Sequence, residues 1–170
     1  MATLYEIKRA SPADISFVAN LLNGSPETGV DAVERLLETC AVSDIWAARH
    51  RGTGAITVLW GLARLDKDQP AIGTYWMLAL DPLDTQLQEV VTLSHLVVVD
   101  MLDQCKLLEN YIDATSYESV QLLKALGFSI GPAELDEGSG RVLHYASLHR
   151  TGPANMTMSL LPNHGPANRT

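Results

Sequence analysis

The sequence has little cysteine, little positive charge and no long hydrophobic run. Its two cysteines, Cys40 and Cys105, lack CxxC spacing and lie on apolar helix stripes, so we expect buried free thiols in a reducing compartment. The formal net charge of -8 at pH 7 argues against nucleic acid and anionic membrane as partners. The N-terminus has a strand pattern rather than a secretory signal, and the apolar runs are too short to span a bilayer.

Several chemical signatures are also absent. The five histidines form no set with metal-ligand spacing, so the sequence predicts no metal site. No G-x-S-x-G elbow or P-loop occurs, and neither cysteine has the context of a nucleophile. The common sequence signatures of zinc enzymes, serine hydrolases and NTPases are therefore missing.

Hydrophobic periodicity predicts one α/β domain over residues 1–150, followed by a C-terminal arm over 151–170. Strands are expected at Leu4–Lys8, Ile45–His50, Ile56–Leu65, Ile72–Leu80, Leu108–Ala114, Phe128–Gly131 and Val142–Leu148. Helices are expected after the cap Ser11, across Val30–Cys40, over about Thr85–Cys105 and after Thr115. The long crossover helix predicts that the strands on either side of it are parallel.

The segment Asn110–Phe128 is the most informative part of the chain. It has the pattern of a strand, a helix and a Gly-Phe exit. We expect Thr115 to cap the helix together with Glu118, and Gly127 to end it in the left-handed conformation.

This segment and the order of the predicted elements resemble the GNAT acyltransferases, the Gcn5-related N-acetyltransferase superfamily, over Leu4–His149. The resemblance implies an α/β fold in which a GNAT-like mixed sheet carries helices on both faces. It also implies an acetyl-CoA site at the start of the long helix, where a Gly-rich loop turns main-chain amides toward the pyrophosphate.

That loop is not found here. No glycine occurs between Gly73 and Gly127, and the corresponding segment contains Asp81, Pro82 and Asp84. Carboxylates repel phosphate, and proline lacks an amide donor. We therefore expect a capped helix and no cofactor. The alternative is a non-standard acetyl-CoA site at Leu83, Asp84 and Thr85.

The family's general acid is missing as well. Aligned on Gly127 and Phe128, the position of the acidic tyrosine is Leu123, which cannot donate a proton. Under the alternative, an N-acyltransferase acting on an amine, Glu109 and Tyr111 are the catalytic candidates. Asp113, Tyr75 and Tyr117 are weaker candidates, since such groups are often solvated or packed.

Within the superfamily, the Asn110–Phe128 segment looks most like the GNAT-like internal virion and head-assembly proteins of short-tailed bacteriophages. The resemblance implies a non-catalytic structural or assembly protein, made in the cytoplasm of a bacterial host and located in the virion. Its partners would be other virion proteins or a second copy of itself. The arm would contribute its apolar centre to that contact, namely Met156, Met158, Leu160 and Leu161.

Overall fold

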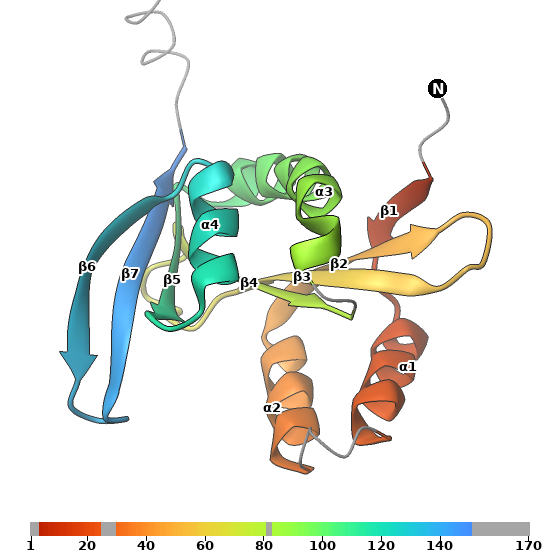
Figure 1. Cartoon of the computed structure of the whole chain (residues 1–170), viewed down its shortest axis with the longest axis horizontal. Coiled ribbons are helices and arrows are strands. Elements are labelled where there is room, and N and C mark those ends of the chain that lie inside the picture. Colours follow the sequence, from red (N-terminus) through yellow and green to blue (C-terminus); the bar gives the residue numbers. More distant parts are fainter. Residues whose placement is uncertain (1–3, 25–29, 81–82, 151–170) are drawn as a thin grey trace, which may run out of the picture.

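The computed structural model describes residues 4–24, 30–80 and 83–150, except for the side chains of residue 30 and residues 83–87. Seven strands form one mixed sheet in the order β1-β2-β3-β4-β5-β7-β6 (Figure 1). The strands are β1 (Tyr5–Arg9), β2 (Ser43–His50), β3 (Ile56–Ala63), β4 (Ile72–Ala79), β5 (Leu107–Asp113), β6 (Ser129–Asp136) and β7 (Arg141–His149). The expected α/β architecture with helices on both faces is confirmed.

Four helices cover the two faces of the sheet. They are α1 (Pro12–Asn23), α2 (Val30–Ala41), α3 (Leu83–Gln104) and α4 (Tyr117–Ala125). Helices α1 and α2 lie on one face and α3 and α4 on the other (Figure 1). None of the helices in the described part of the chain is long and apolar enough to cross a membrane.

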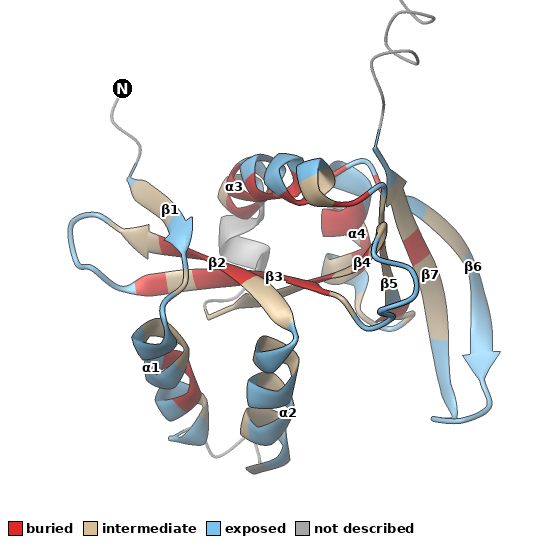
Figure 2. Ribbon diagram, turned by 180° about the vertical axis from the view of Figure 1, so that it is seen from behind, coloured by how far each residue is buried: buried red, intermediate tan, exposed pale blue. Residues whose placement is uncertain are grey.

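Each face of the sheet has its own hydrophobic core, because side chains alternate between the faces along a strand. The larger core lies under α3 and α4 and includes Trp60, Tyr75 and Met101, all almost fully buried. The smaller core lies under α1 and α2 and centres on Val18 and Leu59. Figure 2 shows that burial is concentrated in the middle of the sheet and on the inner sides of the helices.

The expected cap of α1 is confirmed. The Ser11 hydroxyl accepts from the Asp14 amide at 3.2 Å, and the Asp14 carboxylate accepts from the Ser11 amide at 2.9 Å. This reciprocal capping box satisfies two main-chain donors at the start of α1, and Pro12 suits the first helical position because it needs no donor there.

The expected cap of α4 is wrong. Helix α4 begins after Ser116, and the Thr115 hydroxyl donates instead to the Asp113 carboxylate at 2.6 Å. The ionised carboxylate two residues earlier accepts from both the hydroxyl and the amide of Thr115, and such charge-assisted hydrogen bonds are stronger than those between neutral groups. The expected exit is confirmed, since Gly127 has a φ of +93°.

Three other expectations have mixed outcomes. Strand β6 extends to Asp136 where a loop was expected after Gly131, because a register shift between Ile130 and Ala133 restores pairing with β7. Cys105 is a buried free thiol, as expected, whereas Cys40 is only half-buried. The C-terminal arm lies outside the described residues.

Candidate active site

The central feature of the site is a gap between two parallel strands. Strand β4 pairs with β5 in parallel over only three residue pairs, from Ile72 opposite Leu107 to Thr74 opposite Glu109. Beyond Thr74, β4 continues its ladder with β3, while β5 continues with β7. The expected parallel pairing of β4 and β5 is confirmed, but the two strands separate in the middle of the sheet.

The parting leaves main-chain groups of both strands directed into the gap. Leu80 donates its amide to Thr57 on β3, so alternation turns the amides of Tyr75 and Met77 toward β5. In the same way, Ala114 donates to Val142 on β7, which turns the Tyr111 amide toward β4. An extended ligand that carries amides could pair with these strand edges, as a β-strand would.

One of these amides is already satisfied locally. The Asn110 side-chain oxygen accepts from the Tyr111 amide at 2.7 Å. A main-chain amide that loses water without gaining a partner destabilises the folded state. The Asn110 side chain gives the Tyr111 amide such a partner, so this amide is satisfied without a ligand.

Glu109 stands where the two strands separate. It is the last residue of β5 that pairs with β4, and its side chain lies on the face that carries α1 and α2, since it is level with Thr74. The Tyr145 hydroxyl on β7 donates to the Glu109 carboxylate at 2.7 Å. This bond, followed by partial burial and the carboxylate charge, raises the pKa of Tyr145 to about 12. Tyr145 therefore stays protonated at neutral pH and keeps Glu109 in one orientation.

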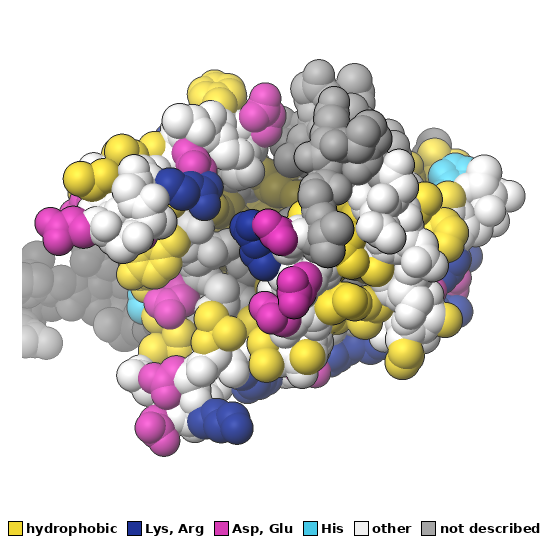
Figure 3. All heavy atoms as spheres, turned by 90° about the horizontal axis from the view of Figure 1, so that it is seen from below, with side chains coloured by type: hydrophobic (Ala, Val, Ile, Leu, Met, Phe, Trp, Pro, Cys, Tyr) yellow, Lys and Arg dark blue, Asp and Glu magenta, His cyan; other side chains and the backbone are white. Residues whose placement is uncertain are grey.

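A hollow of about 400 Å³ opens beside this pair under the β5–β7–β6 part of the sheet. It is lined by Tyr111, Glu134, Leu135, Asp136, Leu143 and Tyr145. The rings of Tyr111 and Tyr145 lie 5.2 Å apart and tilted, so they form one aromatic wall. Figure 3, which views the α1 and α2 face, shows hydrophobic, acidic and basic side chains around a central hollow. Carboxylates beside aromatic faces favour a cationic ligand.

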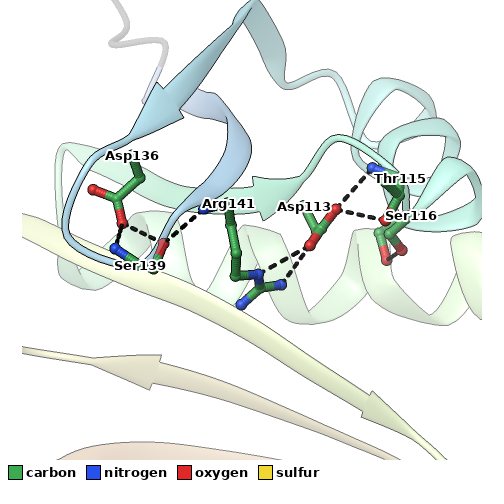
Figure 4. Close-up of polar contacts among 7 residues, drawn as sticks. Asp113, Thr115, Ser116, Asp136, Ser139 and Arg141 are labelled. Carbon is green, nitrogen blue, oxygen red and sulfur yellow. Dashed lines mark hydrogen bonds and ion pairs between the residues drawn. The ribbon is translucent and has the colours of Figure 1, made fainter.

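The far end of this hollow is fixed by a polar network (Figure 4). Arg141 reaches from the start of β7 to Asp113 at the end of β5, and its Nη2 and Nε lie 2.7 Å and 3.0 Å from one carboxylate oxygen. Hydrogen bonds from Thr115, together with Arg141, hold the pKa of Asp113 well below its ordinary value. Asp136 accepts from Ser139 within the adjoining turn. The network ties the β6–β7 hairpin to β5, so the hollow has a defined wall.

The other sequence-predicted residues have different positions. Leu123 is buried against the core, and its aliphatic side chain cannot donate a proton. Tyr75 lies on the opposite face, where burial raises its pKa and its hydroxyl has no hydrogen-bond partner in the described structure. Tyr111 is exposed at the hollow, and Tyr117 is exposed at the start of α4.

Two predicted sets cannot be placed in the site. The side chains of Leu83, Asp84 and Thr85 lie outside the described residues, although α3 does begin at Leu83, directly after β4. Met156, Met158, Leu160 and Leu161 also lie outside the described residues. Among the residues that the structure describes, no group of His, Cys, Asp and Glu could hold a metal ion.

Tyr145 was missed by sequence reasoning. Its contact with Glu109 joins residues 36 positions apart, and it depends on the register that sets Glu109 opposite Ser147 and Tyr111 opposite Tyr145. The only signal was a tyrosine in an alternating strand, which is also what a packing residue produces.

No family model and no curated protein sequence matches this chain. Solved structures do match its fold. Spermidine N-acetyltransferase from Vibrio cholerae in complex with CoA and spermine matches with a TM-score of 0.64 at 12% identity, over 86% of this chain and 95% of that one. Mutant forms of the spermidine/spermine N-acetyltransferase from the same organism match with a TM-score of 0.66 at 12% identity, over 92% and 98%.

A putative acetyltransferase from Acinetobacter baylyi matches with a TM-score of 0.63 at 14% identity, over 91% of this chain and 97% of that one. These likenesses cover nearly the whole of each chain. The protein therefore has the fold of the GNAT acetyltransferases, as the sequence resemblance led us to expect. The matched structures carry no indication of a bacteriophage origin for this chain.

Proposed function

We propose that this protein is an acetyl-CoA-dependent N-acyltransferase that acts on an amine. The observation that carries the proposal is the separation of β4 and β5 after Thr74, with a hydrogen-bonded carboxylate, Glu109, at the point of separation. The acyl donor's pantetheine arm is extended and contains two amides, which suits the open strand edge at Tyr75 and Met77 of β4. The residues present thus fit this part of the donor.

The electrostatics of the face favour an amine as acceptor. Asp113 is paired with Arg141, whereas Glu109 accepts from the neutral Tyr145 and forms no ion pair within the described part of the chain. Glu134 lies on the hollow's wall. These carboxylates attract a protonated amine and lower the free energy of its approach. Among the matched structures, one is described in complex with CoA and spermine, which is a polyamine.

An amine that arrives protonated first loses one proton to water, and the reaction then moves a second proton from the attacking nitrogen and one proton to the donor's sulfur. The neutral amine nitrogen attacks the thioester carbonyl carbon, the C–N bond forms, and the C–S bond breaks. The Glu109 carboxylate takes the proton that the nitrogen loses, directly or through one water. Tyr145 acts as a positioning residue because it holds Glu109 in place and does not ionise near neutral pH. The thiolate takes up a proton from water, since Leu123 offers none.

A second candidate function is non-catalytic binding. It is favoured by the buried Leu123 at the acid position and by Asp81, Pro82 and Asp84 where glycines would receive the pyrophosphate. The assembly role in a virion, with other virion proteins as partners, is one form of this candidate and stays a prediction. The structural likenesses support the acyltransferase better, because they extend over the whole domain.

Turnover separates the two candidates. The full chain is incubated with acetyl-CoA and a panel of amines, and free CoA thiol is measured against time. An acyltransferase releases thiol only when an amine is present, and Glu109→Gln lowers kcat/KM by about 10²–10⁴, the range for a lost general base. The matched control is Glu118→Gln on the exposed side of α4, which should leave turnover unchanged. Absence of amine-dependent thiol release across the panel would favour the non-catalytic candidate.

A further inference from the structure

A second, smaller hollow lies on the α1 and α2 face, next to β4. Its volume is about 240 Å³, and it is lined mainly by Leu22, Ala32, Leu36, Trp76 and Leu78, with Arg35 as its charged residue. Pockets that take a whole drug-sized ligand measure roughly 300–1,000 Å³. This hollow, the apolar pocket below, is therefore sized for a fragment such as one aromatic ring with a short linker.

The main wall of the apolar pocket is preformed. The Trp76 indole donates to the Ser43 hydroxyl at 3.0 Å, and that hydroxyl donates to the Thr39 carbonyl at 2.6 Å. The indole also lies directly against Gly61 of β3, where an added Cβ would be 1.8 Å from the ring. Its polar atom and its ring position are thus both fixed, so an apolar ligand would bind without reorganising the wall.

The apolar pocket lies beside β4, which is one of the two strands that border the gap. Trp76 and Leu78 alternate along β4 with Tyr75 and Met77, whose main-chain groups are directed into the gap. Glu109 lies on the same face as the pocket, since it pairs with Thr74 and the odd-numbered β4 side chains face α3. A ligand with its nitrogen at the gap can therefore extend its body into the pocket.

We propose that the acceptor is a monoamine with an apolar, preferably aromatic, body that occupies the apolar pocket. This inference rests on the proposed function and specifies its substrate. The Arg35 guanidinium makes no ion pair with any residue in the described part of the chain, so its charge is not neutralised there. A second positive charge on the acceptor would be repelled at the pocket. Long polyamines such as spermidine are then the poorer substrates.

The test compares phenethylamine with spermidine as acceptors for the full chain, with acetyl-CoA as donor. We expect kcat/KM for phenethylamine to exceed that for spermidine by about tenfold or more, the range that one apolar fragment adds to discrimination. Ala32→Phe fills the pocket from α2, and it should raise KM for phenethylamine at least fivefold while leaving KM for spermidine within about twofold. Arg35→Glu removes the positive charge that repels a polyamine. It should therefore raise kcat/KM for spermidine and reduce the preference for phenethylamine over spermidine.

Ala41→Phe is the matched control. Ala41 is exposed and, at 3.6 residues per turn, lies on the side of α2 opposite Ala32, so the same bulk should change neither acceptor. Preference for spermidine, or an equal response of both acceptors to Ala32→Phe, would overturn the inference and leave the acyltransferase intact. Turnover of neither amine, nor of any other in the panel, would contradict the proposed function and this inference with it.

Discussion

The hydrogen bond between Tyr145 and Glu109 makes a measurable prediction that does not depend on turnover. The carboxylate is the first cause of the raised pKa of Tyr145, both as hydrogen-bond acceptor and as a nearby negative charge. In Glu109→Gln the acceptor becomes a neutral amide, so the penalty on the phenolate largely disappears. The pKa of Tyr145 should fall from about 12 toward the ordinary tyrosine value of about 10.

The size of the effect follows from the two values. At about pH 11 a group with a pKa near 12 is roughly one tenth ionised, and one with a pKa near 10 is roughly nine tenths ionised. Glu109→Gln should therefore add most of one phenolate per chain at that pH. The direction of the effect on stability also follows. Because folding raises the pKa of Tyr145, this group stabilises the folded state below about pH 10, and that contribution is lost as the pH rises from about 10 to 12.

The assay is the near-ultraviolet absorbance of phenolate, titrated in the wild type and in Glu109→Gln, with circular dichroism to verify that both remain folded. Tyr145→Phe in each background identifies the signal, since the difference in phenolate content between wild type and Glu109→Gln must vanish without the Tyr145 hydroxyl. Equal phenolate content at about pH 11 in wild type and Glu109→Gln, both folded, would refute the contact and with it the positioning role of Tyr145.

Three further predictions concern the framework around the site. Ser94→Ala leaves the Trp60 indole donor, now 2.9 Å from the Ser94 hydroxyl, buried without an acceptor, and should cost about 1–3 kcal/mol in denaturant unfolding; an unchanged midpoint would contradict this. Gly61→Ala places a Cβ against the Trp76 indole, which must move, so the free energy of unfolding should fall by about 1–3 kcal/mol in the same assay. Gly54→Ala is the comparison, because its Cβ would meet no neighbouring atom and only the positive φ of Gly54 is tested. Arg141→Gln weakens what holds Asp113 ionised, so stability should be lost at a higher pH during acid titration, whereas an identical acid limb would show that the pair contributes nothing.

Much of the fold could be predicted from local sequence. The capping box at Ser11 and the left-handed exit at Gly127 are encoded within a few residues, and both are confirmed. The parallel pairing of β4 with β5 follows from the length of the crossover between them. The cap at Thr115 failed because a carboxylate two residues earlier competed for its hydroxyl, and that outcome depends on the turn geometry after β5.

The site was less predictable, since it is made by register between distant strands. Glu109 could be suggested from its place at the end of a strand pattern, but its partner Tyr145 is fixed by the β5–β7 pairing. The wall of the apolar pocket likewise joins Ser43, Gly61 and Trp76 from three strands. The missing glycines led us to expect no cofactor, and that inference considered only the pyrophosphate end of the donor and not the strand edges that could hold its amide-containing arm.

Calorimetric titration of the full chain with acetyl-CoA tests the central claim most directly, because every catalytic step proposed here requires that the donor bind. We predict a single site with a Kd of about 1–100 µM, which is a binding free energy of roughly 5.5–8 kcal/mol. The strand edge at the gap would supply the main-chain contacts for this binding. Desulfo-CoA should compete for it, since it carries the same arm. Absence of binding at millimolar acetyl-CoA, with the protein shown to be folded, would contradict the account and favour a non-catalytic protein with the GNAT fold.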